Sequence, residues 1–113
     1  MAATLSPAAK ALADRLRKDL GITGTRSKAN PVLNVREVIC IRFDSADSPY
    51  REIITAIRGI AWCRTTGRVD WWVEKYLSGL SDWGWCNLLA DVAVSCRVEG
   101  EVPYYLAKRF PRP

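Results

Sequence analysis

The feature of this sequence that most constrains its fold is the recurrence of apolar residues at intervals of three and four. After Pro7, the apolar side chains that would share one face of a helix are Ala9, Leu12, Ala13, Leu16 and Leu20. This spacing is typical of an amphipathic helix with one buried face. Ser6 directly before Pro7 favours a helix start, because serine caps an unpaired N–H and proline is tolerated at the first helical position. Gly21 then predicts the end of this helix.

Similar stripes follow along the chain. Asn30-Pro31 and Ser48-Pro49 repeat the pairing of a capping residue with proline and predict two more helix starts. The stripe after Pro49, which we expect to end near Arg64, consists of Ile53, Ile54, Ile57, Ile60 and Ala61. The next stripe consists of Val69, Trp72, Val73, Tyr76, Leu77 and Leu80. After a break at Ser81-Asp82 come Trp85, Leu88, Leu89 and Val92, and a last short helix is expected over Tyr104 to Phe110.

The segment from Pro31 to Phe43 is the ambiguous one. Val32, Val35, Ile39 and Phe43 make a helical stripe, whereas the β-branched residues and the alternation of Val35, Ile39, Ile41 and Phe43 also suit a strand. The Asn30-Pro31 start favours a helix, and a strand remains the alternative.

These stripes predict an all-α fold, a compact bundle of five or six short helices that bury their apolar faces against one another. The alternative is an α+β fold with one strand or hairpin around residues 32–43. A chain of 113 residues fits one domain, so we expect a single domain over 1–113 with frayed ends at 1–5 and 111–113. The sequence, which begins at Met1, is compatible with a whole protein or with the first domain of a longer one.

Cysteine usage indicates a reducing compartment. Cys40, Cys63, Cys86 and Cys96 lie in apolar stretches without a Cys-x-x-Cys pair, and the chain has no histidine, so a zinc site is not expected. We interpret the cysteines as reduced, buried and hydrophobic. No signal peptide and no run of about 18 apolar residues occurs, which favours a cytoplasmic protein without a membrane span.

The residue types of an enzyme site are scarce. Without histidine, a Ser-His or Cys-His catalytic pair is excluded. The carboxylate pairs Asp44/Asp47 and Asp70/Glu74 fit a polar turn and a solvent-facing helix. Gly21 and Gly24 match no phosphate-binding pattern. We therefore expect no catalysis, no cofactor and no metal.

The net charge of +5, with a pI near 9.3, favours an anionic partner, although basic residues scattered from Lys10 to Arg112 also suit a solvated surface. The five tryptophans are the unusual feature. Trp62, Trp72 and Trp85 fall on the apolar stripes and are expected in the core. Trp71 and Trp83 fall off the stripes and are candidate exposed anchors for a protein partner. The alternative is base stacking beside the basic residues Arg64, Arg68 and Lys75.

The segment TTGRVDWWVEKYLSGLSDWGWCNLLADVA, residues Thr65 to Ala93, carries a turn at Gly67, a helix ending in Leu77-x-x-Leu80 and a Gly84-Trp85 step. It resembles the fourth and fifth helices of caspase recruitment domains, especially those of the RIG-I-like antiviral RNA sensors and their mitochondrial adaptor. The match covers about 30 residues well and about 60 loosely, with Pro31-Val32-Leu33 resembling the start of a family second helix. The resemblance implies a six-helix death fold and a role in innate immunity.

In that family, a basic patch on one domain docks onto an acidic patch on the next. The resemblance implies a basic face of Arg15, Lys18, Arg64, Arg68 and Lys75, and an acidic face of Asp44, Asp47 and Glu52. The expected function is thus a non-catalytic interaction module that docks onto a like domain or a signalling partner, and homo-oligomers are compatible with it. The alternative is a small basic nucleic-acid-binding protein, or a viral or phage accessory protein that inhibits a host complex.

Overall fold

Helices make up every regular element that the structure describes. The computed structural model describes residues 5–22, 34–67, 75 and 77–99. Its helices are α1 (Pro7–Leu20), α2 (Val35–Phe43), α3 (Arg51–Thr65) and α5 (Asp82–Glu99), and Lys75, Leu77 and Ser78 between α3 and α5 are helical as well. The all-α expectation is confirmed. The expected number of five or six helices includes segments outside the described residues, among them Tyr104 to Phe110.

α1 begins and ends where the sequence predicts. The Ala9 N–H donates to Ser6 Oγ over 3.2 Å, and Pro7 occupies the first helical position. Gly21 adopts φ 74°, a left-handed conformation, and its N–H reaches the Lys18 carbonyl over 3.1 Å. A side chain at this position would strain the backbone, so glycine is the favoured residue.

Two helix starts differ from the expected positions. α2 begins at Val35, where Asn34 caps the helix by accepting from the Glu37 N–H over 3.4 Å. Asn30-Pro31, proposed as this start, lies outside the described residues, as does Val32. α3 begins at Arg51 rather than Pro49, because Ser48 forms a turn in which its Oγ accepts from the Tyr50 N–H over 3.1 Å.

The ambiguous segment is helical over Val35–Phe43, so the strand alternative is wrong for these residues. Val35 and Ile39 are buried and Phe43 is half-buried, as the helical stripe requires, whereas Ile41 is 74% exposed. A strand would have pointed Ile39, Ile41 and Phe43 to one face. The helix places Ile41 opposite the core.

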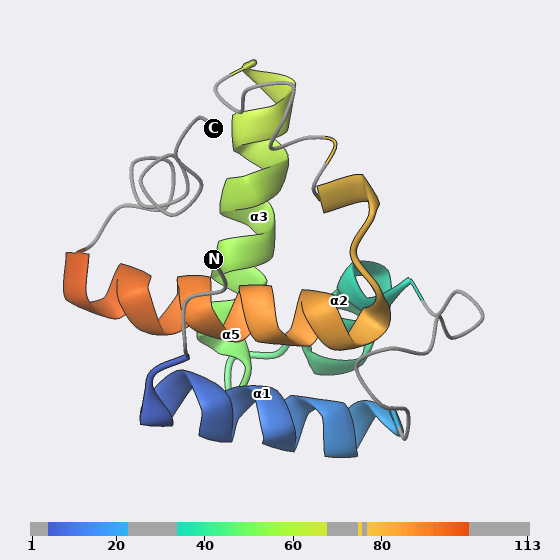
Figure 1. Cartoon of the computed structure of the whole chain (residues 1–113), viewed down its shortest axis with the longest axis vertical. Coiled ribbons are helices and arrows are strands. Elements are labelled where there is room, and N and C mark those ends of the chain that lie inside the picture. Colours follow the sequence, from blue (N-terminus) through green and yellow to red (C-terminus); the bar gives the residue numbers. More distant parts are fainter. Residues whose placement is uncertain (1–4, 23–33, 68–74, 76, 100–113) are drawn as a thin grey trace.

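One apolar interior joins the helices. α1 and α5 lie side by side and run in opposite directions, while α3 crosses α5 and extends beyond it (Figure 1). The largest fully buried side chains are Leu16, Ile39, Tyr50, Ile53, Ile60, Leu77, Leu89 and Val92. The radius of gyration of 13.3 Å is that of a compact chain of this length.

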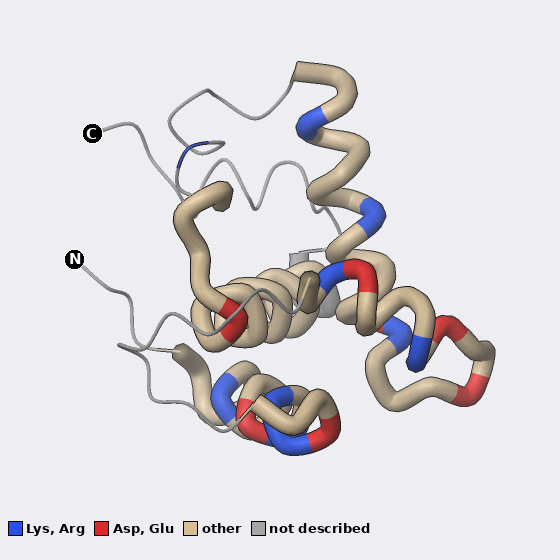
Figure 2. Tube along the Cα trace, turned by 90° about the vertical axis from the view of Figure 1, so that its right-hand side faces the viewer, with Lys and Arg blue, Asp and Glu red and all other residues tan. Residues whose placement is uncertain are grey.

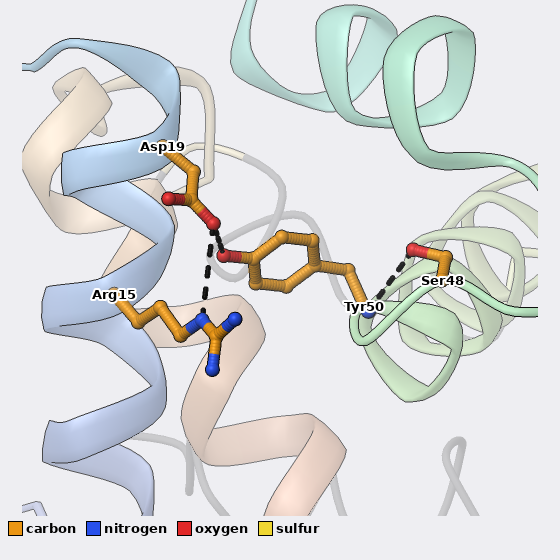
Figure 3. Close-up of polar contacts among 4 residues, drawn as sticks. All are labelled: Arg15, Asp19, Ser48 and Tyr50. Carbon is orange, nitrogen blue, oxygen red and sulfur yellow. Dashed lines mark hydrogen bonds and ion pairs between the residues drawn. The ribbon is translucent and has the colours of Figure 1, made fainter.

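Tyr50 connects the C-terminal end of α1 to the start of α3. Its ring is buried, and its hydroxyl donates to the Asp19 carboxylate (Figure 3). Asp19 also lies 3.9 Å from the Arg15 guanidinium at the surface. This contact fixes which end of α3 is close to α1, so the C-terminal end of α3 points away from α1.

The tryptophans do not divide as their spacing predicts. Trp85 is buried, as expected, but the prediction that Trp62 belongs to the core is wrong, because its side chain is 47% exposed. Trp62 lies near the end of α3, in the part that extends beyond α5. Trp71 and Trp72 lie outside the described residues.

Candidate functional site

The expected basic face is divided between distant parts of the molecule. Arg15 and Lys18 are exposed on α1, whereas Arg64 lies half-buried in the last turn of α3. Because α3 has 15 residues and starts beside α1, its last turn lies on the order of 20 Å from that start. Figure 1 shows the two sites at opposite ends of the molecule. Lys75 is exposed, and Arg68 lies outside the described residues.

The expected acidic residues lie closer together. Asp44 and Asp47 belong to the connection between α2 and α3, and Glu52 lies in the first turn of α3. All three side chains are exposed. Asp44 accepts from Arg58 of α3 over 2.8 Å, and both partners are about half exposed or more, so this ion pair contributes little to stability. Basic and acidic positions also alternate around α1 (Figure 2).

Trp83 does not serve as an exposed anchor. Its side chain is half-buried, and the guanidinium of Arg17 stacks 3.9 Å from the centre of its ring. Arg17 is itself buried, donates to Asn87 Oδ1 over 2.6 Å and pairs with Asp14. The ring of Trp83 therefore completes the packing between α1 and α5. The helical spacing could have predicted that Arg17 is buried, because it follows Ala13 by four residues and precedes Leu20 by three on the buried face of α1.

A surface that the sequence did not reveal lies between α2 and α3. An open hollow of about 280 Å³ is lined by Arg36, Glu37 and Cys40 of α2 and by Ile57, Ile60 and Ala61 of α3, with Asn34 at its end. The exposed Ile41 and Trp62 directly follow Cys40 and Ala61 in their helices. Ile41 and Trp62 are the two exposed large apolar side chains of the described residues, and they belong to the two helices that line the hollow without lining it themselves.

Arg36 closes the hollow on one side. Its guanidinium lies 4.7 Å from the centre of the Trp85 ring, a cation–π contact that orients the side chain. This stack depends on α2 being a helix that starts at Val35. For that reason the sequence pattern, which left helix and strand open, could not predict it.

The four cysteines are free thiols. The thiols of Cys40 and Cys86 and the hydroxyl of Tyr50 are held in their protonated forms. Burial raises the pKa of Cys86 to about 12 and also raises that of the half-buried Cys40. Burial, followed by the bond to Asp19, raises the pKa of Tyr50 to about 12. An activated nucleophile needs the opposite shift, towards the ionised form.

Within the described ranges, no three His, Cys, Asp or Glu side chains are arranged to hold a metal ion. Among the same residues, no helix is both long and apolar enough to cross a bilayer. Comparison with known protein families, curated proteins and solved structures finds no match.

Proposed function

We propose that this chain is a non-catalytic interaction module that docks through its exposed helix faces onto another protein. The observation that carries this proposal is the apolar surface of α2 and α3, which comprises a largely aliphatic hollow between the two helices, Ile41 at 74% exposure and Trp62 at 47%. An open apolar hollow is typical of a binding surface, and tryptophan is among the residues that dominate binding energy.

The charge distribution supports docking to a protein. Lys10, Arg15 and Lys18 are exposed on α1, while the acidic residues gather at the connection between α2 and α3. Asp14 and Asp19 lie among the basic residues of α1, so this surface carries both signs of charge. Such a pattern steers a partner of complementary charge into one orientation and favours correct partners over wrong ones. The resemblance of residues Thr65 to Ala93 to caspase recruitment domains supports a like domain or a signalling protein of innate immunity as that partner.

The ionisation of the buried groups supports a role without catalysis. Tyr50, Cys40 and Cys86 all keep their protons at neutral pH, because burial disfavours their charged forms. The raised pKa values of these thiols and of this hydroxyl therefore make them poorer nucleophiles.

The test is co-purification of the tagged full chain from cells, with and without nuclease, for the wild type and for the double variant Ile41→Ser, Trp62→Ser. We expect a stoichiometric protein that resists nuclease and is lost from the double variant. Arg42→Ser, an exposed substitution on α2, is the control and should retain the partner. Light scattering over a range of concentrations will show whether the partner is a second copy of the chain.

Two results would contradict this proposal. Co-purification of nucleic acid that nuclease removes, with no protein retained, would favour the nucleic-acid-binding alternative. Equal retention of the protein by the wild type and the double variant would show that the α2–α3 surface is not involved.

A further inference from the structure

The hollow between α2 and α3 combines an apolar floor with one cationic side chain. Ile57, Ile60 and Ala61 of α3 and Cys40 of α2 supply the apolar part. With a volume of about 280 Å³, the hollow is large enough for one or two apolar side chains and smaller than most sites for drug-sized ligands. Ile41 of α2 and Trp62 of α3 are exposed but do not line it.

The two arginine–tryptophan stacks found among the described residues differ in a way that points to binding. Arg17 stacks on Trp83, but its N–H groups are also taken by Asp14 and Asn87, so its charge is neutralised inside the fold. Arg36 stacks on Trp85 at the margin of the hollow. The Arg36 guanidinium forms no hydrogen bond and no ion pair with another described residue, and its interaction is the stack on the Trp85 ring. The N–H groups of the planar Arg36 guanidinium are therefore held in one orientation and can donate to a carboxylate.

The other charged groups near the hollow are already engaged. The Glu37 carboxylate accepts from Asn34 Nδ2 over 3.2 Å, and Arg58 is paired with Asp44. The Glu37 carboxylate keeps its negative charge, so the lining carries one charge of each sign, and Arg36 is the one without a hydrogen bond to another described residue. Its guanidinium lies beside aliphatic side chains. A complementary partner presents an apolar side chain together with a carboxylate.

We infer that the α2–α3 hollow binds an acidic amphipathic helix of a partner protein, with an apolar side chain in the hollow and a carboxylate on Arg36. This inference rests on the proposed function and adds the chemistry of the partner. A helix fits because side chains at intervals of three and four share one face, so an apolar anchor for the hollow and a carboxylate for Arg36 can be presented together. A nucleic acid fits less well, because the side chains that line the hollow include no aromatic ring on which a base could stack.

The test is selection of binding peptides from a display library against the wild-type full chain. The library consists of amphipathic helical peptides of about 16 residues, with large apolar residues on one face and randomised polar positions. We expect the enriched peptides to carry Asp or Glu beside their apolar anchors. Their affinity should fall at least about tenfold for Arg36→Glu and for Ala61→Glu, which places a charge in the hollow. Ala61 is exposed, so its replacement leaves the core intact.

The matched control is Arg42→Glu, the same charge reversal on the same helix, at a residue that contacts Phe43 and does not line the hollow. It should change the affinity less than about twofold. Cys40 provides a second measurement at the site itself: bound peptide should slow its alkylation, while Cys96 of α5 reacts at an unchanged rate. Mass spectrometry after proteolysis separates the two thiols.

Failure of this inference can be told apart from failure of the proposed function. Enrichment of basic or uncharged peptides, an unchanged affinity for both hollow variants, or displacement of the peptides by a single-stranded oligonucleotide would overturn the inference. If peptides bind but the hollow variants have no effect, the inference fails, and the Ile41→Ser, Trp62→Ser variant tests the proposed function separately. Absence of any enriched peptide also overturns the inference, and co-purification with the full chain decides the proposed function separately.

Discussion

Tyr50 shows how one residue satisfies two demands of the interior. Its ring is buried and lies 4.7 Å from the ring of Phe43, centre to centre, which adds apolar contact at the junction of α2 and α3. Its hydroxyl has to find a partner, because an unpaired buried polar group destabilises the fold. Asp19 provides that partner from α1. The bond therefore links two helices that are distant in sequence.

Removing this hydroxyl should weaken the fold without disturbing its packing. We expect Tyr50→Phe to lower the free energy of unfolding by about 1–2 kcal/mol, since the bond to a charged acceptor is lost and the ring remains. Urea denaturation measures the change. Arg15→Ala is the control, because the exposed Arg15–Asp19 pair at 3.9 Å should contribute less than about 0.5 kcal/mol. Equal losses would mean that Asp19 acts through Arg15 rather than Tyr50.

The same group predicts how stability depends on alkaline pH. The folded chain holds the Tyr50 proton up to about pH 12, whereas the unfolded chain releases it near pH 10. The stabilisation is therefore complete below pH 10 and is lost as the pH rises from 10 to about 12. Cys86 has the same sign, with loss beginning near pH 9. Denaturation midpoints measured from pH 8 to 12 should fall, and less steeply for Tyr50→Phe. A slope unchanged by that substitution would contradict the assignment.

Arg17 is the residue at which a small chemical change should have a large effect. Lysine keeps the positive charge but cannot stack flat on Trp83 while it bonds to both Asn87 and Asp14. We expect Arg17→Lys to lower stability by about 1–2 kcal/mol, seen as a thermal midpoint lower by several degrees. The neighbouring exposed substitution Lys18→Arg should change stability by less than about 0.5 kcal/mol. A thermal midpoint unchanged by Arg17→Lys would show that charge alone matters at this position.

At the scale of elements, the sequence predicts helices well where caps and stripes agree. Ser6, Pro7 and Gly21 enclose one uninterrupted stripe, and α1 has the expected bounds. In α2 the signals conflicted: a β-branched run suited a strand, and the capping residue is Asn34 rather than Asn30. Local propensity could not decide between helix and strand, because the decision depends on which side chains the rest of the bundle can bury.

Two isoleucines of α2 test this interpretation with the same substitution. Ile39 is completely buried and Ile41 is 74% exposed, although a strand would have placed both on one face. We expect Ile39→Ser to lower the free energy of unfolding by about 3 kcal/mol, because it removes core volume and buries a hydroxyl. Ile41→Ser should change it by less than about 0.5 kcal/mol, since serine and isoleucine have similar helix propensities. Similar losses in urea denaturation would contradict the orientation of α2.

At the scale of the whole molecule, the sequence predicted the interior better than the surface. Helical periodicity identifies residues that must be buried, and most of those in the described part are buried. The candidate basic face required knowledge of how helices are arranged, and Arg64 proves to be far from Arg15. The Arg36–Trp85 stack and the exposure of Trp62 likewise depend on tertiary packing. Spacing along one helix contains no information about its neighbours.

The arrangement of charge over the whole molecule also predicts how it interacts with nucleic acid. The net charge is +5, but Arg15, Arg17 and Arg58 each have an acidic residue within 4 Å, and acidic positions interrupt the basic ones around α1. Single-strand binding needs a continuous basic groove with accessible aromatic faces. Among the described residues, the rings of Trp83 and Trp85 are instead covered by the chain's own arginines.

We therefore expect weak binding to a labelled oligonucleotide of about 20 nucleotides, with a Kd above about 10⁻⁴ M at physiological salt. Fluorescence anisotropy at low and physiological salt measures both the affinity and its salt dependence, and the logarithmic slope should be shallow because few phosphates are neutralised. Asp44→Asn, which releases the exposed Arg58, should strengthen binding and steepen the slope, which shows that the assay responds to a released arginine. Micromolar binding by the wild type that weakens steeply with salt would mean that the basic residues form a nucleic-acid site after all, and the interaction-module proposal would lose its support from charge.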